Sequence, residues 1–166
     1  MREAIVEALS GLPGPVAVAI VSALPIFEVR GGIPVGLFEY RMSLAEILPI
    51  AIVANVLIIV PVLLWFNPLA DWMMERGILT GVVRRLIAKA RSKKPLIDRH
   101  GIWALTLLVA VPLPVTGAWT GAMVASVFEM ELWRAILCIT VGVIIASAVV
   151  SLLCIGGIWG YQAVTG

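Results

Sequence analysis

The chain alternates between long apolar stretches and short polar segments. The apolar stretches cover residues 12–38, 44–66, 102–128 and 132–155. A helix needs about 20 mainly apolar residues to cross the hydrocarbon core of a bilayer, and each stretch is at least that long. The pattern therefore predicts an all-α integral membrane protein.

Two of these stretches are interrupted near the middle by prolines and glycines. The interruptions are residues 24–36 (LPIFEVRGGIPVG) and 111–121 (VPLPVTGAWTG). Matched interruptions in two halves of a membrane protein are typical of a substrate site at the interface of two repeats. The residues expected to break the helices are Pro25, Gly31, Gly32, Pro34 and Gly36 in the first and Pro112, Pro114, Gly117 and Gly121 in the second.

Both halves follow the same order: an interrupted stretch, a charged connector and an uninterrupted helix. We therefore expect one membrane domain with two repeats, at about 12–66 and about 101–156, joined by a connection at about 67–100. Each broken segment either turns back as a re-entrant helical hairpin or continues as a kinked span. Hairpins make the repeats inverted and put both termini outside, whereas kinked spans put both termini inside. The hairpin arrangement is our working hypothesis.

Composition and charge support the membrane prediction and orient the chain. Hydrophobic residues make up 61% and charged residues only 13%, whereas soluble domains are about 25% charged. Positively charged loops stay on the cytoplasmic side of the cell membrane, so the connection at 67–100 is expected to be cytoplasmic. It carries eight of the twelve Lys and Arg residues, namely Arg76, Arg84, Arg85, Lys89, Arg91, Lys93, Lys94 and Arg99.

Part of this connection has the pattern of an amphipathic helix. Its apolar positions recur at three- and four-residue spacing between Leu79 and Ala90, and basic residues fill much of the other face. We interpret this segment as a helix lying on the membrane surface. A specific site for a lipid headgroup or a nucleotide is the alternative.

Two charged residues lie within the first interruption. A charge near the middle of a bilayer costs at least about 2.5 kcal/mol and usually serves a function. Arg30 is therefore expected to bind a negative charge on the substrate, and Glu28 to couple transport to a proton or another cation. The alternative is a purely structural ion pair.

Four further residues are candidates for the walls of the substrate site. Thr116, Trp119 and Thr120 belong to the second interruption, and Asn55 lies near the middle of an uninterrupted helix. Their hydroxyl, indole and amide groups suit a polar cavity. Local hydrogen bonds, or packing for Trp119, are the alternative explanation.

The sequence offers little for enzyme chemistry. His100 is the only histidine, and Cys138 and Cys154 stand far apart in apolar helix. We expect no enzyme activity, no metal or other cofactor and no nucleic-acid binding. The expected partners are membrane lipids, a small solute or lipid phosphate, and a second copy of the chain, because 166 residues with two broken segments provide few walls for a pathway.

The two interrupted segments together resemble the small multidrug export protein family, and more distantly the DedA membrane proteins. The first resemblance implies export. The second implies paired re-entrant hairpins and movement of polyprenyl-phosphate or other lipids. DedA proteins carry two arginines in the second hairpin, where this chain has Val109 and Val115.

The sequence therefore predicts a small secondary transporter or exporter of an anionic or amphiphilic solute, coupled to protons or another ion. Two alternatives stay open. The chain could be a flippase or scramblase for a lipid phosphate, or a membrane scaffold that transports nothing.

Overall fold

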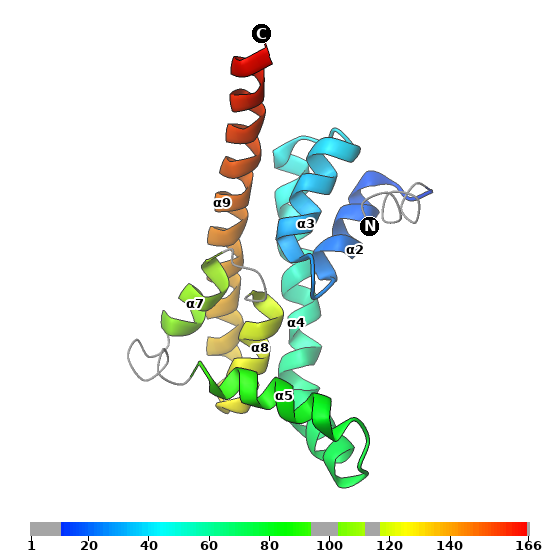
Figure 1. Ribbon diagram of the computed structural model, residues 1–166, viewed down its shortest axis with the longest axis vertical. Coiled ribbons are helices and arrows are strands. Elements are labelled where there is room, and N and C mark those ends of the chain that lie inside the picture. Colours follow the sequence, from blue (N-terminus) through cyan, green and yellow to red (C-terminus); the bar gives the residue numbers. More distant parts are fainter. Residues whose placement is uncertain (1–10, 94–102, 112–116, 166) are drawn as a thin grey trace. The chain divides into compact units, whose positions relative to one another are not determined.

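The computed structural model describes residues 11–93, 103–111 and 117–165, and every regular element in this part is helical (Figure 1). The sequence also predicts a short surface helix over residues 1–10, which lie outside the described part. The elements are α2 (Gly14–Ala23), α3 (Glu28–Pro34), the π-helical turn η1 (Val35–Glu39), α4 (Leu44–Glu75), α5 (Thr80–Arg91), α7 (Trp103–Ala110), α8 (Ala118–Val127) and α9 (Leu132–Thr165).

The described chain forms two compact units. The first contains the residues up to Asn55 and those from Ile144 onward, and the second contains Val56–Val143. Helices α4 and α9 each contribute residues to both units. Each unit holds one of the two interrupted segments, α2 with α3 in the first and α7 with α8 in the second.

Among the described helices, two are long and apolar enough to cross a membrane: Leu44–Glu75 and the part of α9 over Leu132–Gly157. Both present aliphatic side chains on the surface, and Leu57 of α4 is 64% exposed and Leu152 of α9 is 70% exposed. Exposed aliphatic rows on long helices suit contact with lipid. The shorter apolar helices α2 and α8 have ten residues each, about half of what a span needs.

Both long helices extend further than the sequence indicated. Helix α4 continues past Phe66 to Glu75, and α9 continues past Ile155 to Thr165. Helix α4 passes through Pro68, which removes only one backbone donor, and the residues that follow are mostly good helix formers. The first part of the predicted 67–100 connection therefore belongs to α4.

In the first unit, the interrupted segment is a helical hairpin. Helices α2 and α3 pack against each other across a turn at residues 24–27 (Figure 1). Their close approach depends on glycine. A Cβ atom on Gly32 would overlap the side chain of Ser22 and lie 3.2 Å from the carbonyl oxygen of Val18, while one on Gly36 would lie 2.7 Å from Ile47. Small residues four apart allow such contact between helices.

The second arm of this hairpin changes from α- to π-helix at its proline. Pro34 has no N–H to donate to the carbonyl of Arg30, four residues earlier. The N–H of Val35 is shared between the carbonyls of Gly31 and Gly32, and the π-helical turn Val35–Glu39 follows. The proline thus accounts for a local change of helix type that the sequence pattern had marked only as a break.

In the second unit, α7 and α8 contact each other, and α7 also fits closely against α9. A Cβ on Gly121 of α8 would lie 2.7 Å from Val109, and one on Gly142 of α9 would lie 2.6 Å from the same residue. The hydroxyl of Thr106 donates to the carbonyl of Cys138 at 3.1 Å. Glycines therefore permit close packing around the interrupted segment in this unit as well.

The connectors that precede the two long helices share an unusual backbone conformation. Arg41 and Glu129 both have φ of 50°, and each lies three residues before the first residue of its helix. The N–H of Glu129 donates to Ser126 and that of Met130 to Ala125, which is a Schellman turn. In the first connector, the corresponding hydrogen bond runs from the N–H of Met42 to the carbonyl of Gly36. It spans one residue more than the bond from Met130 to Ala125, because this connector follows the π-helical turn.

We predict that Gly32→Ala lowers the free energy of unfolding by about 1–3 kcal/mol, because the new methyl group overpacks the contact with α2. Unfolding of the purified chain in detergent, followed by circular dichroism, measures the change. Gly81→Ala is the control, since nothing lies within 4 Å of its added Cβ and alanine favours helix. Equal effects of the two substitutions would contradict the packing explanation.

We predict that Glu129→Gly raises the free energy of unfolding by up to about 1 kcal/mol, because glycine adopts the left-handed backbone region without steric cost. The neighbouring substitution Met130→Gly removes a side chain where φ is not positive, and it should destabilise the protein. The same unfolding experiment compares them, and a loss of stability for Glu129→Gly would show that the Glu129 side chain matters more than its backbone.

Candidate functional site

The charged residues Glu28 and Arg30 lie at the start of α3, at the bend of the first hairpin. Glu28 is only 6% exposed and Arg30 is half-buried. The two side chains attract each other electrostatically. Such attraction is strong where water is largely excluded, so the hairpin can hold both charges at a buried position.

The backbone at Glu28 is also unusual. Its φ of 50° lies in the left-handed region, which costs a residue with a side chain about 1 kcal/mol or more. Strained backbone of this kind collects at functional sites, where the surrounding structure maintains it. The bend thus combines a buried carboxylate, a guanidinium group and a strained backbone within three residues.

Asn55 lies on the buried side of α4, in line with Ile47, Ala51 and Ile59 at four-residue spacing. Its side chain is fully buried, and neither atom of its amide group has a hydrogen-bond partner in the part of the chain that the structure describes. Buried amides are nearly always hydrogen-bonded to protein or water. Asn55 is therefore suited to bind a water molecule or a polar ligand.

Ser22 is a candidate that the sequence did not single out as a site residue. Its hydroxyl is fully buried against Gly32 and has no hydrogen-bond partner among the described residues. The sequence offers only a weak signal for Ser22, which follows Val18 by four residues and therefore shares its face of α2. In the structure this face lies opposite Gly32 and Gly36.

The remaining predicted wall residues belong to the second interruption. Thr120 is buried and Trp119 is half-buried, and both stand in the first turn of α8. Gly117 precedes this helix in extended conformation. The second unit thus contains Trp119 and Thr120, and the first contains Glu28, Arg30 and Asn55. The candidates that lie outside the described residues are Pro112, Pro114 and Thr116.

A pair of polar residues in the second unit has a structural role that the sequence did not reveal. The side-chain amide of Asn67 donates to the carbonyl of Ser126 at 2.7 Å. The hydroxyl of Ser126 donates to the carbonyl of Ala122 at 2.9 Å and approaches that of Leu63 at 3.4 Å. These bonds connect α8 to the second part of α4. Asn67 and Asn55 therefore belong to one helix but differ completely in hydrogen bonding.

The described residues contain no group of three or more His, Cys, Asp or Glu side chains that could hold a metal ion. Cys138 and Cys154 are free thiols.

The described chain combines two helices long and apolar enough to cross a membrane with a charged pair in a broken helical segment. Residues 28–149 match the family model described as putative small multi-drug export protein, and the chain belongs to this family. The match includes Glu28, Arg30 and the whole second interruption. Comparison with curated proteins and with solved structures gave no match. The family and the apolar helices together indicate a membrane location and a general role in export.

We predict that Asn55→Leu keeps or raises the free energy of unfolding, because it replaces a buried amide without partners by an apolar group of similar size. Asn67→Leu is the matched control on the same helix. It should lower the free energy of unfolding by about 1–3 kcal/mol, because the side-chain hydrogen bond that connects α4 to the carbonyl of Ser126 in α8 is lost. Unfolding in detergent compares both variants, and a large loss for Asn55→Leu would mean that its amide is already satisfied in the folded protein.

Proposed function

We propose that the chain is a secondary transporter that exports an anionic or amphiphilic solute, with transport coupled to protons or another cation. The observation that carries this proposal is the buried carboxylate of Glu28 beside the half-buried Arg30 at the bend of a helical hairpin. A charged pair of this kind is costly in a membrane protein and could usually be replaced by apolar packing. Its presence is best explained by a charged or polar cargo.

The proposed roles follow from the chemistry of the two groups. The guanidinium group of Arg30 offers a planar set of donors that suits a carboxylate, sulfate or phosphate group on the solute. The carboxyl group of Glu28 exchanges a proton or binds a cation. When Glu28 is neutralised, Arg30 is released from its partner and attracts the anion, so the two events are linked.

The proposed membrane arrangement extends the observed hairpin. Helix α2 has ten residues, and α3 with η1 has twelve, or about 15 and 18 Å at about 1.5 Å per residue. Arms of that length reach about the middle of the hydrocarbon core and suit a re-entrant segment. We propose that the second interruption forms its inverted counterpart and that residues 67–100 face the cytoplasm. The shared left-handed turn at Arg41 and Glu129 supports the repeat.

In this proposal, Asn55, Thr116, Trp119 and Thr120 contribute polar walls, and the glycines allow the solute to approach the backbone. A second copy of the chain completes the pathway as a homodimer in the cell membrane. The protein needs no cofactor and catalyses no covalent reaction.

We predict that purified protein in liposomes dissipates an imposed pH gradient only when a transported solute is present. A trapped pH-sensitive dye reports the gradient, and a panel of anionic amphiphilic dyes supplies candidate solutes. Glu28→Gln should abolish the solute-dependent proton flux, and Arg30→Gln should weaken the apparent solute affinity at least about tenfold, equivalent to about 1.4 kcal/mol.

Glu39→Gln and Arg41→Gln are the matched controls, because they make the same chemical changes at two exposed positions, the last residue of η1 and the connector that follows it. They should leave the flux unchanged. The double variant Glu28→Arg with Arg30→Glu keeps both charges but exchanges their positions, and so separates function from structure. Compared with the single variants, it should restore yield and folding without restoring the solute-dependent proton flux. If wild type moves no dye but equilibrates labelled phosphatidylglycerol between leaflets, the protein is a lipid scramblase. If it moves neither, the scaffold interpretation holds.

A further inference from the structure

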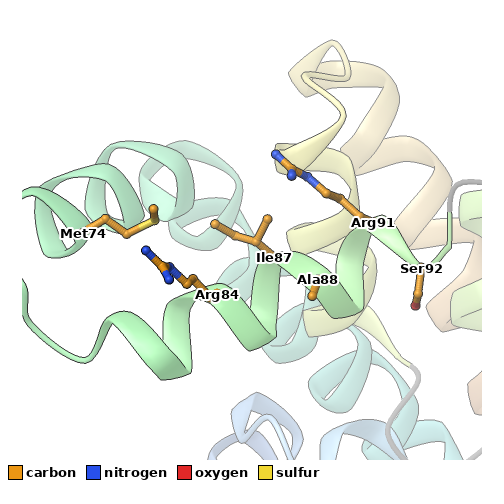
Figure 2. Close-up of a pocket in the computed structure, with 6 residues that line it drawn as sticks. All are labelled: Met74, Arg84, Ile87, Ala88, Arg91 and Ser92. Carbon is orange, nitrogen blue, oxygen red and sulfur yellow. The ribbon is translucent and has the colours of Figure 1, made fainter.

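A basic cleft lies at the junction of α4 and α5, within the second unit. Its volume is about 530 Å³. Figure 2 shows Arg84, Ile87 and Arg91 rising from α5 on the side that faces Met74, which belongs to the last turns of α4. The lining residues are Met74, Arg84, Ile87, Ala88, Arg91 and Ser92.

The cleft combines two kinds of surface. Met74, Ile87 and Ala88 supply an apolar floor, and Arg84 and Arg91 supply positive charge. These two arginines are seven residues apart, so they stand on one face of α5, about 10 Å from each other along the helix axis. Two long guanidinium side chains at that spacing can converge on one anionic group between them.

Helix α5 carries a strong excess of positive charge. Helix α5 has four basic residues and no acidic one between Thr80 and Arg91. Among the described residues, none of these basic side chains forms an ion pair. An external anion is therefore the natural partner for the cleft.

The position of the cleft along α4 indicates where that anion comes from. Trp72 lies one turn from the end of α4, is exposed, and has the guanidinium group of Arg76 over its ring at 4.8 Å. Exposed tryptophan near the end of a span marks the membrane interface. Met74 lies two residues further along α4, which puts the cleft at the level of lipid headgroups.

The packing of α5 also supports a position at the level of the lipid headgroups. Val83 and Ala90 are buried, and α5 contacts α8, so α5 is fixed against the protein by one edge. Val82 remains 48% exposed and Leu79 61% exposed, which leaves apolar side chains for the acyl region. The helix is thus both attached to its unit and equipped to touch lipid.

We propose that this cleft binds the phosphate headgroup of an anionic phospholipid, with Arg84 and Arg91 on the phosphate and with Met74 and Ile87 against the first carbons of the lipid. The site is separate from the proposed transport pair and stands whether or not the protein is a transporter. Basic pockets beside transmembrane helices on the cytoplasmic side recognise anionic headgroups in this way.

The test measures thermal unfolding of the full chain in a neutral detergent during titration with short-chain phosphatidylglycerol. A ligand that binds only the folded state raises the unfolding temperature as its concentration rises. Phosphatidylcholine of the same chain length and soluble glycerol phosphate are titrated in parallel. We expect saturable stabilisation by phosphatidylglycerol and little by the other two.

The decisive comparison uses two double variants that each lose two positive charges of α5. Arg84→Gln with Arg91→Gln removes the charges that line the cleft, and should weaken the phosphatidylglycerol response at least about tenfold. Arg85→Gln with Lys89→Gln removes charges outside the cleft, and should change the response less than about threefold. Ala88→Phe, which fills the cleft without removing charge, should behave like the first variant.

Equal weakening by the two charge variants would overturn the proposal and leave a general basic surface. Equal stabilisation by phosphatidylcholine would mean that the headgroup charge is irrelevant. Equal stabilisation by glycerol phosphate would identify a site for soluble phosphates instead of lipid. If the first charge variant does not fold, a normal phosphatidylglycerol response of Ala88→Phe would still refute the cleft as the binding site.

Discussion

The rest of the structure depends on one constraint: in an apolar environment, the backbone must satisfy its own hydrogen bonds. The described chain meets this constraint with helices and confines irregular backbone to short segments. Where Pro34 removes a donor, the next N–H bonds to two carbonyls and a π-helical turn follows. Where the chain reverses before α9, the turn at Glu129 bonds back to the last carbonyls of α8. These local hydrogen bonds pair backbone groups that the breaks would otherwise leave unsatisfied, at a cost in free energy.

Close packing around the breaks relies on glycine in both units. Gly32 and Gly36 admit α2 in the first unit, and Gly121 and Gly142 accommodate Val109 of α7 in the second. Lipid gives helices little hydrophobic reason to associate, so close van der Waals contact carries much of the association. The glycines that mark the interruptions in the sequence therefore do two things: they loosen the helix locally and bring neighbouring helices into contact.

Much of the helical architecture could be predicted from the sequence. The amphipathic pattern placed α5 to within one residue at either end, and the Pro and Gly residues located the first hairpin. The extension of α4 beyond Phe66 was missed, because the residues that follow are no longer continuously apolar. The π-helical turn was missed, because the pattern marks Pro34 only as a break and not as a change of helix type. In the candidate site, Glu28, Arg30 and Asn55 were selected because they are polar or charged residues within apolar stretches. The pattern gave no sign that Asn67 is hydrogen-bonded while Asn55 is not.

The length of α4 has a consequence for the membrane around it. Its 32 residues span about 48 Å, whereas the hydrocarbon core measures about 30 Å. The excess is accommodated by tilt or by protrusion, and the balance between them depends on bilayer thickness. In a thicker bilayer we expect the end of α4 to lie deeper and to carry α5 with it. Membrane thickness would then change the depth of the basic helix relative to the headgroups.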